Sequence, residues 1–210
     1  MEEKINYEKM REILIEVAET IIKHADQLTD LDRACGDGDF GVGMYRGFMN
    51  AKNNIQSYQG RDIGELFEKV GLAIMSSVGG ASGPVFGTFF NAAGMKLKGK
   101  SEVGLKDLAE AFKTSSDMIA NLGKVQRGDK TMFDALAPAV EALQSAAASG
   151  LSLKEAFKNA AEAAEKGAEA TKEMVAKKGK ASYLGEKTLG HPDPGAVTIS
   201  LIFKVISEKI

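Results

Sequence analysis

The chain is organised around residues 31–47, LDRACGDGDFGVGMYRG. Three carboxylates, Asp32, Asp37 and Asp39, lie within eight positions and repel one another unless a cation neutralises them or water separates them. Carboxylate oxygens are hard, acceptor-only ligands that suit Mg²⁺. Gly41 and Gly43 follow, and glycines let backbone N–H groups approach an anion closely. The stretch therefore indicates a phosphate group held through a metal ion.

Two other interpretations apply to this stretch when it is taken alone. An ordinary polar loop, with aspartates capping the helix that follows, remains open. An EF-hand calcium loop is excluded, because the aspartate spacing is wrong and no bidentate glutamate occupies the last loop position. The rest of the chain has to decide between the metal site and the plain loop.

Composition limits the class of protein. The 210 residues suffice for one sizeable domain or two small ones, and 44% of them are apolar. A net charge of −2 and a pI near 5.8 argue against nucleic acid as the main partner. Cys35 is the only cysteine, which excludes an internal disulfide and fits a reducing cytosol. Without an apolar signal region or a membrane-length apolar run, the protein is expected to be cytoplasmic, with no membrane partner.

Apolar residues recur at three- and four-residue steps along most of the chain, which predicts α-helices. The first helix is expected to begin after the N-cap Asn6 and to stop near Asp30. No run of alternating β-branched residues bounded by hairpin turns predicts a strand. We therefore expect an all-α, single-domain bundle of eight antiparallel helices. Their apolar faces cover residues 10–28, 44–55, 66–77, 82 onward, 105–122, 136–147, 153–175 and 197–206.

Local signals mark where these helices begin. Ser82 is the expected N-cap of the fourth helix, with Pro84 in its first turn, where the missing N–H of proline costs nothing. Pro138 lies inside the sixth helix and is expected to kink it unless that helix begins late. The other start signals are Asp62 with Glu65, Thr131 with Asp134, Ser152 with Glu155, and Asp193 with Pro194.

Alternate connections of an antiparallel bundle lie at the same end. The connections after helices one, three, five and seven are the aspartate stretch and residues 79–84, 123–131 and 177–195, and these are the glycine-rich ones. A helix start offers free N–H groups to an anion, although the small residues at 79–84 also suit tight helix packing. One end of the bundle is therefore predicted to bind a ligand. The ligand that fits this end best is a nucleotide polyphosphate with one or two Mg²⁺ ions. The sequence contains none of the common nucleotide-binding motifs, so the site is expected to be of another type.

Three further residues keep two interpretations each, and a fourth, His24, has one. His24 is interpreted as a surface or boundary residue. His191 touches phosphate or shapes its loop, and Lys180 meets phosphate or is simply solvated. Met132 lies against an adenine ring or belongs to the core.

Four long motifs, in order, carry a family resemblance. They are LDRACGDGDFGVGMYRGF at 31–48, SSVGGASGPVFGTFF at 76–90, RGDKTMFDAL at 127–136 and KGKASYLGEKTLGHPDPGA at 178–196. Over nearly its whole length the chain resembles the L subunit of dihydroxyacetone kinase, the ADP-binding subunit of the phosphotransferase-system-dependent form. The resemblance implies one nucleotide-binding domain spanning residues 1–210. It also implies a barrel of eight antiparallel helices, with the nucleotide between the loops at one end.

The resemblance further implies a set of site residues but no catalytic side chain. ADP or ATP would be held through two Mg²⁺ ions bound by Asp32, Asp37 and Asp39. The remaining contacts fall on Phe40, Gly41, Val42 and Gly43 around the phosphates, Ala81 and Ser82 at a helix start, Gly123 and Met132 beside adenine, Lys180 as a basic contact, and Asp193, Pro194 and Gly195 in a closing loop.

Three positions depart from the family pattern. Relatives commonly carry His where Phe40 stands, some carry Asn at Gly43, and some carry Arg at Lys180. Phe40 cannot donate to a phosphate through its side chain, so that contact is lost, moved to a backbone N–H or replaced by water. Lysine keeps the charge of arginine but loses its bidentate geometry. The expected metal ligands are unaffected by these changes.

The resemblance implies a kinase subunit that works with partners. In the family, a K subunit binds dihydroxyacetone covalently through a histidine, and a phosphoryl-donor protein of the phosphotransferase system recharges the bound ADP in place. Since only His24 and His191 are present, this chain is expected to lack ketose kinase activity by itself. Alternatives are an ADP-loaded regulatory or interaction module, or an L-type domain serving a kinase of another short ketose or of fatty acid kinase type. A homodimer is left open.

Overall fold

The structure is a computed structural model that describes residues 3–210. Helices account for most of this part of the chain. The α-helices are α1 (Tyr7–Lys23), α2 (Ala25–Cys35), α3 (Phe40–Ser57), α4 (Ile63–Ser77), α5 (Ser82–Leu97), α6 (Leu105–Gly123), α7 (Phe133–Ser149), α8 (Leu153–Ala170) and α9 (Pro194–Lys209). Two strands, β1 (Lys4–Asn6) and β2 (Glu102–Gly104), and two 3₁₀ helices, η1 (Thr171–Glu173) and η2 (Lys180–Thr188), complete the fold.

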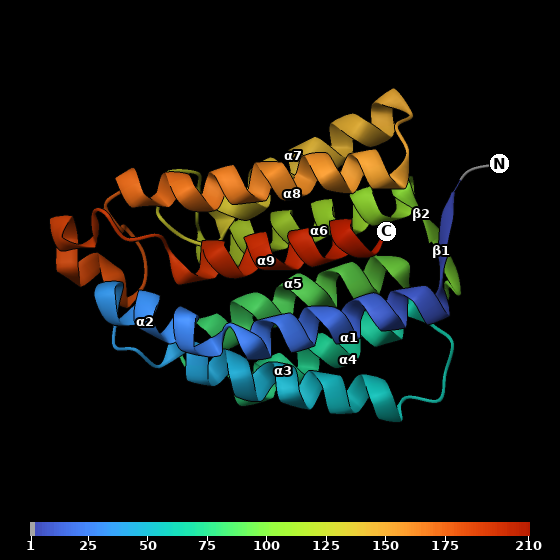
Figure 1. Cartoon of the computed structure of the whole chain (residues 1–210), viewed down its shortest axis with the longest axis horizontal. Coiled ribbons are helices and arrows are strands. Elements are labelled where there is room, and N and C mark those ends of the chain that lie inside the picture. Colours follow the sequence, from blue (N-terminus) through green and yellow to red (C-terminus); the bar gives the residue numbers. More distant parts are fainter. Residues whose placement is uncertain (1–2) are drawn as a thin grey trace.

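Eight of these helices form a closed ring. Helix α1 packs on α3, each helix from α3 to α8 packs on the next one along the chain, and α9 returns to α1 (Figure 1). The additional helix, α2, packs on α3 and α9. The all-α fold is therefore confirmed, and the ring corresponds to the eight-helix barrel that was expected.

Phenylalanine rings fill the interior of this barrel. The ring centroid of Phe112 on α6 lies 5.6 Å from that of Phe89 on α5 and 5.4 Å from that of Phe203 on α9. All three side chains are buried, and aromatic pairs at such distances add to the free energy gained from burial alone. Helix α9 contacts α1, α2, α7 and α8, so it packs against helices from both ends of the chain.

Helices α4 and α5 are packed closely enough for their backbones to meet. A Cβ atom placed on Gly64 would lie 2.5 Å from the carbonyl oxygen of Gly94, which no side chain can tolerate. Gly64 and Gly94 therefore serve close helix packing. They lie outside residues 79–84, for which packing and ligand binding were both kept open; within that stretch, a Cβ on Gly83 would lie 2.2 Å from the carbonyl oxygen of Val78, so the packing there is close as well.

Several helix starts are confirmed by their caps. The side chain of Asn6 accepts from the N–H of Lys9, and that of Asp62 accepts from the N–H of Glu65. Ser152 and Glu155 form a reciprocal capping box at the start of α8. Pro138 lies within α7, which runs without interruption from Phe133 to Ser149.

The expected single first helix is wrong. The chain forms two helices that meet at His24, whose Nδ1 lies 2.8 Å from the carbonyl oxygen of Thr20. The second of them, α2, continues past Asp30 to Cys35. Asp32 therefore lies on the last turns of a helix, whereas the sequence placed it in the loop.

The expectation of no strand is also wrong. Strands β1 and β2 pair antiparallel, with Ile5 opposite Val103, at the end of the molecule opposite η2 (Figure 1). Each strand has three residues, which is too short to show the alternation by which strands are found in a sequence. Among the described residues, no helix combines the length and apolar character needed to cross a bilayer.

Candidate functional site

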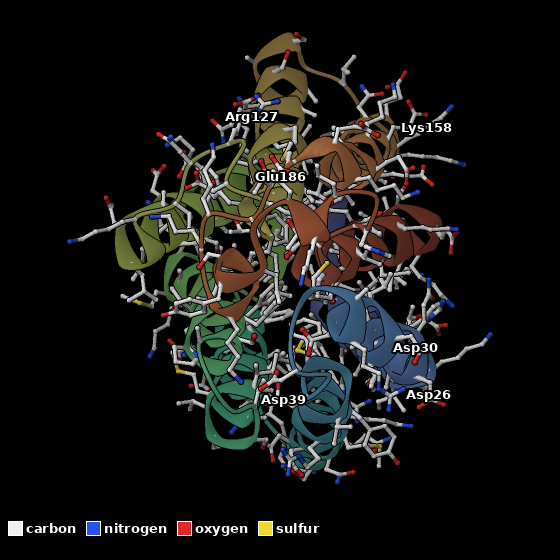
Figure 2. The ribbon with its side chains drawn as sticks, turned by 90° about the vertical axis from the view of Figure 1, so that its left-hand side faces the viewer. Asp26, Asp30, Asp39, Arg127, Lys158 and Glu186 are labelled. Atoms are coloured by element: carbon white, nitrogen blue, oxygen red, sulfur yellow. The ribbon has the colours of Figure 1, made fainter. Side chains whose placement is uncertain are left out.

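The four glycine-rich connections meet at one end of the barrel, as the sequence predicted. They surround a cavity of about 330 Å³ that is lined by residues of all four. Figure 2 looks onto this end, where Glu186 of η2 lies between Asp39 and Arg127. Since the connections come from distant parts of the chain, only the barrel brings their side chains together.

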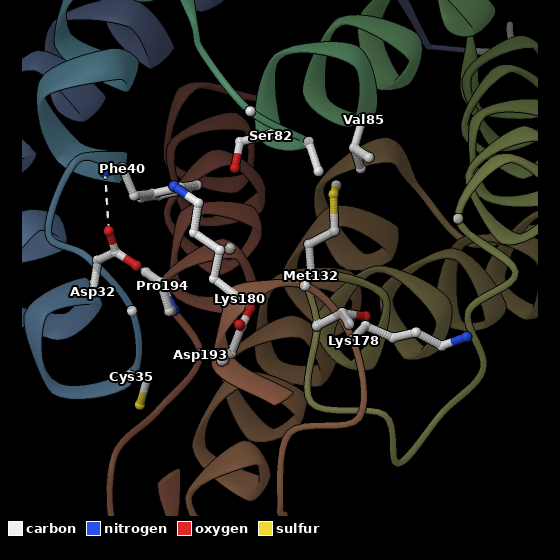
Figure 3. A pocket seen from close by; sticks show the side chains of 18 of the residues that line it. Asp32, Cys35, Phe40, Ser82, Val85, Met132, Lys178, Lys180, Asp193 and Pro194 are labelled. Carbon is white, nitrogen blue, oxygen red and sulfur yellow. Dashed lines mark hydrogen bonds between the residues drawn. The ribbon is translucent and has the colours of Figure 1, made fainter. Parts of the chain in front are cut away.

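Three carboxylates converge at one side of the cavity. Asp32, on α2, and Asp37 and Asp39, in the short loop to α3, each offer an oxygen within 4.8 Å of the others. Asp32 also accepts a hydrogen bond of 3.0 Å from the backbone N–H of Phe40 (Figure 3). Glycine at position 36 permits this close approach of the chain to Asp32, because a Cβ there would lie 2.4 Å from a side-chain oxygen of Asp32. The donor set, three hard oxygens at close range, suits Mg²⁺.

Lys180 faces this carboxylate cluster from η2. Its Nζ pairs with Asp37 and lies 3.5 Å from Asp39. Figure 3 shows the side chain of Lys180 extending toward Phe40. The hydrogen bond from Lys180 lowers the pKa of Asp37, and the same bond raises the pKa of Lys180. Lys180 thus places a positive charge, on a long and flexible side chain, beside the anionic cluster.

Two helices begin beside the cavity without a capping hydrogen bond from their own N-cap residue, although Asp32 accepts from the first N–H of α3. Helix α3 follows Asp39 and α5 follows Ala81, and neither residue makes a side-chain capping hydrogen bond. The expected cap by Ser82 is wrong, because α5 already includes this residue in its first turn. Uncapped first-turn N–H groups and the positive end of the helix dipole favour an anion.

The opposite side of the cavity is apolar. Met132, at the start of α7, is buried, and Figure 3 shows its sulfur directed toward Val85 of α5. Phe86, Ile119 and Val125 complete this surface. The cavity therefore combines a charged side with an apolar side wide enough for a planar ring.

Asp193 closes the floor of the cavity and caps α9. Its Oδ2 accepts a 2.7 Å hydrogen bond from the N–H of Ala196. The residue as a whole is half-buried, and the burial around its carboxyl raises the pKa of Asp193 to about 7, against the opposing effect of the Ala196 N–H. The neighbouring Asp134 raises this pKa further, whereas Lys130 lowers it.

We expect Asp193 to make stability depend on pH. Below about pH 4 the carboxyl is protonated in both the folded and the unfolded chain. Between about pH 4 and 7 it ionises first in the unfolded chain, so the free energy of unfolding falls as pH rises, by up to ~4 kcal/mol. Asp193→Asn keeps a good N-cap residue but removes the titration. Urea unfolding of both proteins from pH 4 to 8 measures the difference.

The matched control is Asp62→Asn, at the N-cap of α4 on the outside of the barrel. The stability difference between wild type and Asp193→Asn should change across this pH range more than that between wild type and Asp62→Asn. Equal pH profiles for the two variants would contradict the assignment to Asp193.

Most of the site residues inferred from the sequence line the cavity, but three do not. Gly41 and Gly43 are buried in the first turn of α3, and Val42 is exposed there. Their part in binding stays a prediction. Those that line the cavity are Asp32, Asp37, Asp39, Phe40, Ala81, Ser82, Gly123, Met132, Lys180, Asp193, Pro194 and Gly195.

Other lining residues were missed. Val85 and Ile119 lie on helices, where their apolar character was attributed to the core. Lys130 stands within a motif that was noted, but nothing local distinguishes it from a solvated lysine. The ring centroid of Phe40 lies 6.0 Å from that of Phe86, and the backbone N–H of Phe40 donates to Asp32.

Comparisons with known proteins agree on one family. The family model described as the DAK2 domain matches residues 34–208. The "PEP-dependent dihydroxyacetone kinase, ADP-binding subunit DhaL" of Escherichia coli strain K12 is 39% identical over 183 residues, which cover 87% of each chain. The "PEP-dependent dihydroxyacetone kinase 2, ADP-binding subunit DhaL" of Listeria innocua is 36% identical over 200 residues, covering 94% of this chain and 92% of that protein.

Solved structures show the same fold. The crystal structure of the dihydroxyacetone kinase from C. freundii in complex with AMP-PNP and Mg²⁺ superposes with a TM-score of 0.74 at 26% identity. The match covers 100% of this chain and 35% of that one, so the chain corresponds to about a third of the longer protein.

Proposed function

The chain belongs to the DAK2 domain family, and from this premise we propose that it is the nucleotide-binding subunit of a dihydroxyacetone kinase. Residues 1–210 act as one domain that holds ADP or ATP with Mg²⁺ in the cavity at the loop end of the barrel. The observation that carries the proposal is the carboxylate cluster of Asp32, Asp37 and Asp39, with oxygens within 4.8 Å, beside the start of α3 and the uncapped start of α5.

The residues present fit the metal and the phosphates. The three aspartates would hold Mg²⁺, as two ions when a nucleoside diphosphate is also bound. The first turns of α3 and α5 would supply N–H groups for the phosphate oxygens. When bound, Mg²⁺ supplies neutralisation of phosphate charge during phosphoryl transfer. Lys180, which pairs with Asp37 here, would bind phosphate oxygens instead, because Mg²⁺ held by the aspartates would neutralise their charge and leave phosphate as the stronger acceptor.

The apolar side of the cavity fits the base. Met132 and Val85 form the wall that an adenine ring would contact, and Gly123 leaves room at its edge. A thioether and a branched aliphatic side chain pack well on a planar ring, and a buried methionine adapts its shape to it. These contacts fix the orientation of the nucleotide, so that its phosphates lie toward the aspartates.

The chain's own contribution to catalysis is positioning. Cys35 is buried, and burial raises the pKa of its thiol, which disfavours a nucleophilic role. Phosphoryl transfer needs orientation and charge neutralisation rather than a reactive side chain. A K-type partner subunit supplies dihydroxyacetone, and a phosphotransferase-system protein recharges the bound ADP in the cytoplasm. The homodimer stays a prediction.

Native mass spectrometry and a coupled assay test the proposal. The gently purified protein is expected to carry ADP with Mg²⁺, and to lose it with excess EDTA. Phosphorylation of dihydroxyacetone should require this chain, a K-type subunit and a phosphoryl-donor protein together. Nucleotide retention without turnover under all partner combinations would favour the ADP-loaded module instead. Failure to bind ADP in the presence of Mg²⁺ would refute both.

A further inference from the structure

Lys130 is a buried lysine with an unusual set of partners. It is 3% exposed, and its Nζ donates to the carbonyl oxygens of Thr171, Met174, Thr188 and His191 at 2.7, 3.1, 2.6 and 2.6 Å. An ammonium group has three N–H bonds, so at least one of them is shared between two of these oxygens. Within residues 3–210, no ion pair joins Lys130 to a carboxylate. Its positive charge is thus solvated by backbone carbonyls.

All four carbonyls belong to one segment. We call residues 171–193, the connection from α8 to α9, the capping segment. Thr171 and Met174 stand where it leaves α8, and Thr188 and His191 stand where it approaches α9. Lys130 therefore joins the two ends of the segment by donating hydrogen bonds to both of them.

The capping segment forms one wall of the cavity. Lys178, Gly179, Lys180 and Ala181 in its middle part line the cavity, as does Asp193 at its end. Other hydrogen bonds also join its two ends: Gly190 N–H donates to Lys172 O at 2.8 Å, Asp193 N–H to Thr171 Oγ1 at 2.8 Å, and Ala176 N–H to Thr188 Oγ1 at 3.1 Å. Lys177 N–H donates to Asp129 O at 3.0 Å, which ties the segment to the loop that carries Lys130. The place of Lys180 opposite the aspartates thus depends on how the two ends are held.

The backbone at Lys130 is held in a conformation that serves this contact. Its φ is +60°, in the left-handed region that side chains other than glycine rarely adopt. Asp134 fixes the loop around it by accepting from the N–H of Gly128 and, at 2.8 Å, from that of Thr131. Strain of this kind persists where surrounding contacts over-determine the conformation.

We infer that Lys130 is a positioning residue, an internal cation that holds the capping segment closed over the nucleotide cavity. The inference rests on the proposed function for its consequence in binding, but its structural part does not. Without the ammonium group, the buried carbonyl oxygens of Thr171 and Thr188 and the part-buried ones of Met174 and His191 each lose a charged donor, although Thr171 O keeps the N–H of Met174. The two ends of the segment then lose the partner that they share, while the packing of the barrel helices is expected to stay unchanged.

Hydrogen exchange of the ligand-free protein tests the structural part. Lys130→Met, close in shape but uncharged, is expected to reduce protection of amides in residues 171–193 about 100-fold, with amides of α4 and α5 unchanged. The matched control is Lys172→Met, in the same segment, whose Nζ pairs with Glu169 at the surface. That variant should leave protection unchanged. Unchanged protection in Lys130→Met, or an equal loss over the whole barrel, would overturn the inference.

Chemical rescue distinguishes a lost donor from a lost shape. Lys130→Ala removes three methylenes and the ammonium group, which propylammonium can replace. Propylammonium at millimolar concentration is expected to restore most of the protection of the capping segment. Tetramethylammonium carries the same charge without N–H donors and should restore none. Equal effects of the two ions would overturn the role of hydrogen bonding. If Lys130→Met does not fold, Lys130→Arg should show the same local loss, because a planar guanidinium cannot reproduce the ammonium geometry.

Nucleotide release tests the consequence. ADP is expected to dissociate from Lys130→Met about 10-fold faster than from wild type in Mg²⁺, because the wall that carries Lys180 opens more often. If hydrogen exchange of the capping segment in Lys130→Met increases as expected but the dissociation rate of ADP is unchanged, the capping segment does not gate the cavity. A wild type that binds no ADP would refute the proposed function and leave the exchange result standing.

Discussion

Asp37→Ala is expected to lower the affinity for ADP with Mg²⁺ on the order of 100-fold or more, while helix content stays unchanged. Loss of a residue that merely supports a metal ligand already costs about 10–100-fold, so loss of a ligand should cost at least as much. The side chain of Asp37 is 48% exposed and lies in a loop, so its removal leaves the barrel intact. Calorimetric titration with ADP in Mg²⁺, beside far-ultraviolet circular dichroism, measures both quantities.

Two controls separate metal binding from other effects of this change. Asp26→Ala removes an exposed carboxylate from α2 outside the cavity and should leave affinity unchanged. Lys180→Met removes the ion-pair partner of Asp37 but no metal ligand, so it should weaken ADP binding less and leave the Mg²⁺ dependence in place. Equal ADP content in wild type and Asp37→Ala would refute the assignment of the three aspartates as metal ligands.

Gly41→Ala is expected to destabilise the protein by about 3 kcal/mol, the upper part of the usual range for overpacking. A Cβ on Gly41 would lie 2.1 Å from the carbonyl oxygen of Ala25 and 2.2 Å from Oγ1 of Thr29. Both atoms belong to α2, and Thr29 Oγ1 already donates to Ala25 O at 2.9 Å, so neither can move freely. Helices α2 and α3 must separate, which displaces Asp32 from Asp37 and Asp39.

The sign of this effect distinguishes packing from helix propensity. Alanine in place of glycine inside a helix stabilises by about 1 kcal/mol where space is available. Gly79→Ala, where no atom lies within 4 Å of the added Cβ, serves as the stability control and should show little change. Urea unfolding followed by circular dichroism gives both values. A Gly41→Ala protein as stable as wild type would contradict the close approach of α2 and α3.

Local signals in the sequence identified most of the helix boundaries. The caps at Asn6, Asp62, Ser152 and Asp193 lie within three residues of the N–H groups that they satisfy, so their partners are visible in the sequence itself. The helical period identified the buried faces for the same reason. The position of the four glycine-rich connections at one end followed from counting helices, and the cavity lies there.

The same local reasoning failed where a distant partner decides the outcome. Strand β1 exists because residues near position 103 lie beside it, and the break at His24 directs α2 toward the cavity. The sequence predicts Ser82 as the N-cap of α5, but the helix already begins at Ser82. The residue before it, Ala81, is the N-cap and has no side chain that could accept a capping hydrogen bond. For β1 a tertiary contact overrides the weak local preferences of a three-residue segment, whereas the helix boundaries at His24 and Ser82 differ from preferences worth about 1 kcal/mol.

By itself the sequence determined the all-helical class, the end of the barrel that carries the cavity, and the aspartates gathered within eight positions of one another. Tertiary structure alone decided which carboxylate stands on a helix, which apolar side chains face the cavity, and that Lys130 is buried among carbonyls 41 to 61 residues away. The physical reason is the range of the interactions. Capping and periodicity act within a helical turn, whereas the environment of a buried charge is formed only when distant segments close around it.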